Sequence, residues 1–157
     1  MKITIVKGTG VGVTPLAAFD AALLDAGVPN YNLIALSSVI PAGTTVECGK
    51  YQSDPADYGD RLYVVLACQK TVQPGEMAWA GLGWVQEPET GRGLLAELHG
   101  NSKSVVQQDI YLTLSQMVAS RPDLAAGPIE SELIGILCED QPVCALVLAV
   151  YVNQKWA

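Results

Sequence analysis

The sequence has 157 residues, a length typical of one domain with a real hydrophobic core. Half of the residues are apolar, 16% are charged, and the net charge is −7. This composition excludes a disordered chain and indicates extensive burial, which is compatible with an oligomer. The acidic balance, without any cluster of Lys or Arg, excludes a nucleic-acid-binding protein because phosphates would be repelled.

Neither export nor membrane insertion is indicated by the sequence. The first ten residues, MKITIVKGTG, are too short and too interrupted by glycine for a signal peptide, and no apolar run reaches the ~18 residues that a membrane span needs. The four cysteines form no CxxC pair and His99 is the only histidine, so no metal site is expected. We therefore expect a soluble, reduced protein of the cytoplasm.

Taken in chain order, residues 2–6 alternate and are β-branched, which predicts a strand. The glycines of residues 8–12 predict a flexible loop, and Thr14 followed by a proline predicts the start of a helix over 15–26. Asp20 is expected on the buried face of that helix, where a carboxylate needs a partner. At helical spacing, the apolar stripe consists of Leu16, Phe19, Leu23 and Leu24.

Residues 31–36 predict a second strand, and residues 41–60, rich in Pro, Gly, Asp and Ser, predict a loop. A capping pair, Asn101-Ser102, predicts a second helix over 103–120. Further strands are predicted at 62–68, 77–85, 93–99, 129–138 and 143–152, the last two as a hairpin that brings Cys138 opposite Cys144. This order predicts an α+β fold: one domain over 1–157, built as a four-layer α/β/β/α sandwich with mainly antiparallel sheets.

Motifs of two common enzyme classes are missing. A single histidine, His99, leaves no room for a Ser-His-Asp triad, and there is no GxSxG elbow. The glycines of residues 8–12 are spaced GxGxG rather than GxGxxG, so a turn into the helix is favoured over a nucleotide-binding loop.

The most informative segment runs from Asn32 to Pro41, NLIALSSVIP. On residue chemistry alone, Ser37 and Ser38 simply end a strand. Together with TPLAAFDAALL at residues 14–24, however, the segment resembles the pyruvoyl-dependent arginine decarboxylases, which pair a TPLxAFDxALLxAG helix with NLIxxSS(I/V)xP. The resemblance resumes at GLLAELHG, residues 93–100.

In that family the second serine attacks the preceding carbonyl and the chain breaks. The resemblance implies cleavage between Ser37 and Ser38, giving a β chain of residues 1–37 and an α chain of residues 38–157. Ser38 would become a covalent pyruvoyl group, the electron sink for decarboxylation of L-arginine to agmatine. The family also implies a homotrimer of αβ units with the site between neighbouring subunits.

The resemblance assigns the remaining site residues. Glu97 would return a proton to the substrate, and burial in its apolar strand would keep it protonated near neutrality. Asn32 would stabilise the oxyanion during cleavage. Asp20 and Ser37 would bind the substrate, with Asp20 meeting the guanidinium.

Each of these residues also has a structural interpretation. Glu97 fits an outward-facing strand residue, Asn32 fits a strand-start residue bonded to nearby backbone, and Asp20 could pair with Arg61 or Arg92. Two other functions therefore stay open. One is a non-catalytic, uncleaved trimeric homologue that binds a cationic metabolite, and the other is a pyruvoyl decarboxylase of another basic amino acid.

Overall fold

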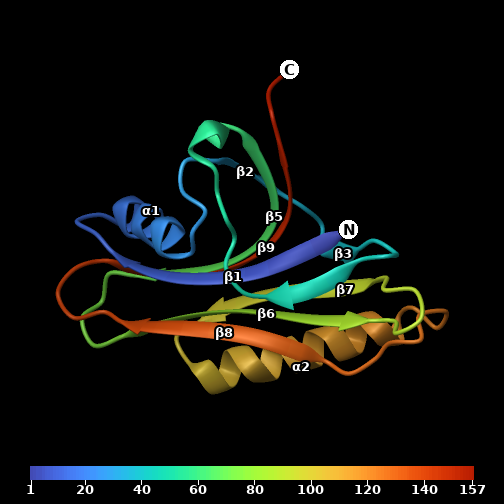
Figure 1. The fold of residues 1–157 in the computed structure, drawn as a ribbon. Helices are drawn as coiled ribbons and strands as arrows, with labels where there is room; N and C mark the ends of the chain where they lie inside the picture. Colours follow the sequence, from blue (N-terminus) through green and yellow to red (C-terminus); the bar gives the residue numbers. More distant parts are fainter.

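The computed structural model describes all 157 residues as two β-sheets packed face to face, with one helix on each outer side (Figure 1). The elements in chain order are β1 (Lys2–Val11), α1 (Pro15–Asp25), β2 (Asn32–Ala35), β3 (Val39–Ile40), β4 (Thr45–Cys48), the 3-10 turn η1 (Pro55–Asp57), β5 (Arg61–Thr71), β6 (Met77–Gln86), β7 (Gly93–Gly100), α2 (Lys103–Ala119), β8 (Glu130–Leu137) and β9 (Val143–Gln154).

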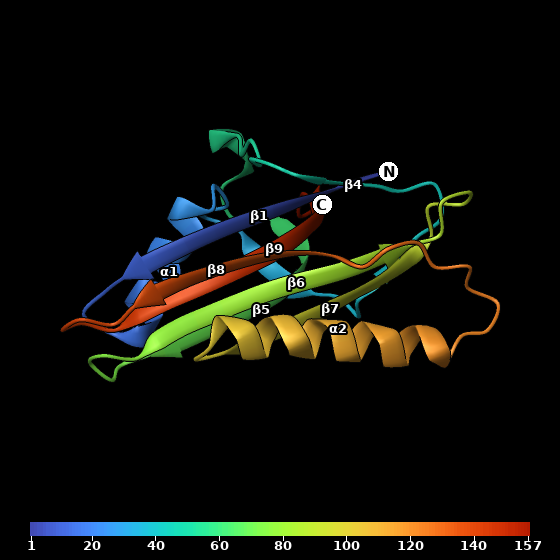
Figure 2. The same cartoon turned by 90° about the horizontal axis from the view of Figure 1, so that it is seen from below.

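The five-stranded sheet has the order β2-β5-β9-β1-β4, and the four-stranded sheet has the order β3-β7-β6-β8. Only the outer pairs β1–β4 and β2–β5 are parallel, so the predicted four-layer, mainly antiparallel sandwich is confirmed. The main core lies between the sheets, and Leu82, Leu95 and Val147 are among its buried residues. Figure 2 shows α2 running along the outer side of the four-stranded sheet. Neither helix is long and apolar enough to cross a membrane.

The predicted apolar face of α1 is wrong in part, because Phe19 and Leu23 pack against the core but Leu16 and Leu24 do not. Ala18 and Ala22 are fully buried against the five-stranded sheet, whereas Leu16 and Leu24 are 72% and 57% exposed. Glycines in β1 explain the difference, because a Cβ at Gly10 would lie 2.3 Å from the Ala18 carbonyl oxygen. Only a helix face of small residues can approach a strand so closely.

The glycines therefore do not form the predicted loop, since Gly8 and Gly10 lie within β1. Alternate residues of a strand point to the same face, so Gly8, Gly10 and Gly12 all face α1 and place no side chain against it. The helix bounds themselves are as predicted, since the Thr14 hydroxyl accepts a hydrogen bond from the Ala17 N–H at 3.1 Å.

The predicted C-terminal hairpin is also wrong. β8 pairs with β6 in the four-stranded sheet, and β9 lies between β5 and β1 in the other sheet. Consequently Cys138 is buried between the sheets, while Cys144 lies on the α1 side with its Sγ 3.5 Å from the Sγ of Cys68. All four cysteines are free thiols.

The predicted loop over 41–60 contains one further strand. β4 pairs in parallel with β1, matching Ile3 with Val46. Its side chains are mostly exposed, so the segment carries no apolar alternation that would have predicted a strand.

Candidate active site

Ser37 and Ser38 lie where the chain passes from one sheet to the other. Leu36 still belongs to the five-stranded sheet through its N–H, which donates to the Val64 carbonyl at 2.9 Å. The Ser38 carbonyl already belongs to the second sheet and accepts from the Leu95 N–H at 2.9 Å. The Ser37–Ser38 peptide bond is therefore fixed on both sides by strands of different sheets.

The side chain of Ser38 faces the rim of the space between the sheets. It lies on the same face of its strand as Ile40, which is buried in the main core. Glu97 follows Leu95 in the same alternation on β7, and Tyr151 follows Ala149 on β9. All three polar side chains thus occupy inward positions just where the core opens to solvent.

Ser38 and Glu97 are in direct contact. The Ser38 hydroxyl donates a hydrogen bond of 2.6 Å to Oε2 of Glu97. The expected burial of Glu97 is not found in the single chain, where its side chain is exposed. A carboxylate held against the hydroxyl orients that hydroxyl.

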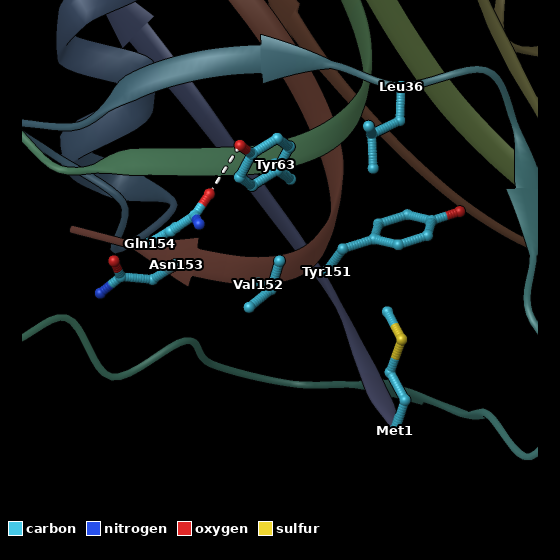
Figure 3. A pocket seen from close by; sticks show the side chains of 7 residues that line it. All are labelled: Met1, Leu36, Tyr63, Tyr151, Val152, Asn153 and Gln154. Atoms are coloured by element: carbon cyan, nitrogen blue, oxygen red, sulfur yellow. Dashed lines mark hydrogen bonds between the residues drawn. The ribbon is translucent and has the colours of Figure 1, made fainter. Parts of the chain in front are cut away.

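Tyr151 lies on the other side of the same segment. Its hydroxyl donates to the Val39 carbonyl oxygen at 2.8 Å, and burial and the charge of Glu97 together raise the pKa of Tyr151 to about 12. Its ring lines a cavity of about 380 Å³ together with Leu36 and Tyr63 (Figure 3). The Tyr63 hydroxyl points away from Leu36 and donates to Gln154 at 2.8 Å.

Asn32 is not brought to Ser38 within the chain. Its Nδ2 donates to the Gly59 carbonyl at 2.7 Å, and its N–H donates to the Asp60 carbonyl. Five residues separate it from Ser38 along the chain, and an extended strand rises ~3.3 Å per residue. In this geometry Asn32 anchors the start of β2 to the loop before β5.

Asp20 is also apart from Ser38. It is exposed on the outer side of α1, and neither of the arginines considered as partners contacts it. Arg61 donates to the Lys155 carbonyl, and Arg92 pairs with Glu87 and Asp123. In Figure 1, α1, which carries Asp20, and β3, which follows Ser38, lie towards opposite ends of the molecule.

Tyr151 is the one residue at this rim that sequence reasoning missed. It is embedded in the apolar run of β9, where an aromatic residue normally indicates core. The available signal was its alternation with Val147 and Ala149, which places a hydroxyl on the inward face at the end of the core.

The geometry defines a class of two-sheet α+β proteins in which a serine at the sheet-to-sheet crossover contacts a carboxylate. A family model described as "Pyruvoyl-dependent arginine decarboxylase" matches residues 2–155. The chain belongs to the pyruvoyl-dependent arginine decarboxylase family.

Individual relatives carry the same description. The pyruvoyl-dependent arginine decarboxylase of Halobacterium salinarum is 51% identical over 83 residues, which are 53% of this chain and 51% of the relative. That of Methanococcoides burtonii is 32% identical over 111 residues, 70% of this chain and 62% of the relative. That of Nitrosopumilus maritimus is 28% identical over 122 residues, 76% of this chain and 67% of the relative. The match therefore spans about half the length of the first relative and up to two thirds of the others.

Proposed function

We propose that this chain cleaves itself between Ser37 and Ser38 and, with the pyruvoyl group so formed, decarboxylates L-arginine to agmatine. The observation that carries the proposal is the 2.6 Å contact between the Ser38 hydroxyl and Glu97 at the crossover, in a chain of this family. Cleavage would divide the single domain 1–157 into a β chain, 1–37, and an α chain, 38–157.

The cleavage chemistry uses atoms of this segment only, together with one water. The Ser38 Oγ bonds to the Ser37 carbonyl carbon, the C–N bond breaks, and the hydroxyl proton ends on the freed Ser38 nitrogen. Loss of the Ser38 Cα proton then expels the Ser37 carboxylate, leaving a dehydroalanine. Its tautomer takes up water and releases ammonia, which leaves a keto group at position 38.

The residues around Ser38 fit the pyruvoyl group. The Ser38 carbonyl would become the amide carbonyl of that group, and its hydrogen bond from the Leu95 N–H is compatible with this change. A pyruvoyl carbonyl binds the substrate amine and accepts electrons as carbon dioxide leaves. Glu97, beside the position of the former hydroxyl, is suited to deliver a proton to the substrate carbon.

We also propose that the site is shared between subunits of a homotrimer. Asp20 and Ser38 lie far apart in one chain, so a site that uses both needs a neighbouring chain. The outer side of α1 supports this, because exposed Leu16 and Leu24 flank Asp20 at helical spacing. Asp20 would then meet the substrate guanidinium, while Ser37 and Ser38 of the neighbour hold its reacting end.

In this proposal Asn32 has only a structural role, which is to fix the start of β2. Its side chain is occupied by the Gly59 carbonyl, so an oxyanion role would require that bond to break. A cytoplasmic location is proposed from the four free thiols, because a reducing compartment keeps closely spaced cysteines unlinked.

Intact-mass measurement of the purified protein tests the cleavage. Denatured wild-type protein should separate into residues 1–37 and 38–157, the latter beginning with pyruvoyl, whereas Ser38→Ala should remain one inactive chain. A wild-type protein that keeps its full mass after prolonged incubation would favour the non-catalytic, metabolite-binding homologue.

Carbon dioxide release from arginine, lysine, ornithine and histidine then tests the substrate. We expect arginine to be preferred, because a carboxylate binds the planar guanidinium through two hydrogen bonds. A cleaved enzyme that prefers another amine would contradict the arginine assignment and leave the cleavage chemistry standing.

A further inference from the structure

Tyr151 lies beside the chain on both sides of the Ser37–Ser38 bond. Its ring shares a cavity wall with Leu36, which precedes the two serines, and its hydroxyl binds the carbonyl of Val39, which follows them. In Figure 3 the hydroxyl points towards the segment that continues from Leu36.

An irregularity in β9 leaves Tyr151 without a strand partner. Val64 pairs with Val150 and Tyr63 pairs with Val152, so the register shifts by one residue at Tyr151. An extra residue of this kind bends a strand and redirects one side chain, and such bulges are frequent beside active sites. Here the unpaired residue is Tyr151, whose hydroxyl binds the Val39 carbonyl.

The environment keeps the Tyr151 hydroxyl a hydrogen-bond donor. Burial, followed by the charge of Glu97, raises the pKa of Tyr151 to about 12, so the phenol stays protonated throughout the physiological range. Its single proton is engaged by the Val39 carbonyl, so Tyr151 has no proton to exchange with the reacting groups.

We propose that Tyr151 is a positioning residue, which holds Val39 so that the Ser38 hydroxyl faces the Ser37 carbonyl. This inference rests on the proposed self-cleavage. Leu36 is fixed through Val64 and Ser38 through Leu95, both by backbone bonds. The Tyr151–Val39 bond is a third fixed point of the backbone and, unlike the other two, is made by a side chain. After cleavage the same bond anchors the second residue of the α chain, directly behind the pyruvoyl group.

Two matched substitutions in one cavity test this role. Tyr151→Phe removes the bond to Val39, and Tyr63→Phe removes a bond to Gln154 that does not involve the crossover. We expect Tyr151→Phe to slow cleavage roughly 3- to 10-fold, the range for losing one neutral hydrogen bond, and Tyr63→Phe to cleave at the wild-type rate.

Hydroxylamine separates positioning from general loss of structure. It cleaves an ester at Ser37 but not a peptide bond, so it counts the chains in which Ser38 has already attacked. Tyr151→Phe should give a smaller hydroxylamine-sensitive fraction, while Tyr151→Phe and Tyr63→Phe, each in a Ser38→Ala background, melt within a few degrees of each other.

Equal slowing by Tyr151→Phe and Tyr63→Phe would overturn the inference, since the cause would then be cavity packing. Wild-type cleavage by Tyr151→Phe would overturn it as well, while leaving the proposed function intact. A wild-type protein that forms no ester and never cleaves would remove the proposed function itself, and this role with it.

Discussion

Glu97 contacts the Ser38 hydroxyl directly, and that contact allows two contributions of one side chain to be separated. As a hydrogen-bond acceptor it orients the hydroxyl before cleavage, and as an acid it would protonate the substrate afterwards. The first contribution needs only an oxygen at the right place, whereas the second needs a titratable group.

We therefore expect Glu97→Gln and Glu97→Ala to differ. The amide oxygen of Gln still accepts from Ser38, so Glu97→Gln should cleave normally and lose ~10²–10⁴-fold in turnover. Ala supplies no acceptor, so Glu97→Ala should be slow in cleavage as well. Intact mass gives the cleavage rate and carbon dioxide release gives the turnover. Unchanged turnover in Glu97→Gln would remove Glu97 from the reaction.

At the scale of elements, Glu87 joins the β6–β7 connection to the segment that follows α2. Its buried carboxylate accepts hydrogen bonds from the Arg92 guanidinium, the Thr90 hydroxyl and the Ala125 N–H. Arg92 also donates to the Asp123 carbonyl at 2.7 Å. These bonds, the Arg92 pair foremost, lower the pKa of Glu87 to about 2.

The lowered pKa predicts how the stability depends on pH. The folded state favours the carboxylate, so its contribution is complete above the ordinary pKa of 4.5 and is lost as the pH falls towards 2. Glu87→Gln should therefore melt below wild type at pH 7, and the gap should close between about pH 4.5 and 2. Exposed Glu89→Gln is the control and should show no such gap. Calorimetry at several pH values measures it, and a gap independent of pH would contradict the assignment.

The bounds of the two helices could be predicted closely from the sequence, but those of several strands and many of the contacts between elements could not. Thr14 caps α1 and Ser102 caps α2, because cap bonds are local. The face that α1 buries depends on glycines of another element, so the larger apolar residues, Leu16 and Leu24, were wrongly expected inside. Likewise, a strand's period shows which residues share a face but not that β8 and β9 belong to different sheets.

The candidate site shows the same division. Ser38 and Glu97 were predicted from the family motifs, and the structure brings their side chains together. Tyr151 was missed, because its alternation with Val147 and Ala149 places it only on the inward face, whereas its bond to Val39 joins residues far apart in the sequence. Asn32 and Asp20 were expected at the same site, and only an assembly of chains could bring Asp20 there.

At the scale of the whole molecule, a shared site predicts complementation between inactive chains. Asp20→Asn leaves a guanidinium facing a neutral amide, and losing one partner of a desolvated charge pair typically costs ~3–5 kcal/mol. Such a chain still has Ser38, and a Ser38→Ala chain still has Asp20. Mixed trimers should therefore contain intact sites, roughly a quarter of all sites if equal amounts assemble at random.

A second mixture supplies the control. Ser38 and Glu97 touch within one chain, so Ser38→Ala and Glu97→Gln chains can never contribute both residues to one site. We expect agmatine formation from arginine in the first mixture after co-expression and none above background in the second. If neither mixture formed agmatine, Asp20 would act within its own chain or have no role in the reaction.

The position of the serines at the crossover has a consequence for assembly. Residues 1–37 contain β1, which lies between β9 and β4 of the remaining chain, and β2, which pairs with β5. Cleavage at Ser37 would therefore not free residues 1–37, because their strands are hydrogen-bonded into a sheet whose other strands belong to residues 38–157. Before the cut, folding is unimolecular. Afterwards, two separate molecules would have to meet and interleave, so recovery from unfolding would depend on concentration. The topology therefore requires that the chain fold before it is cleaved. After cleavage, the two separate pieces would reach the same arrangement far less readily.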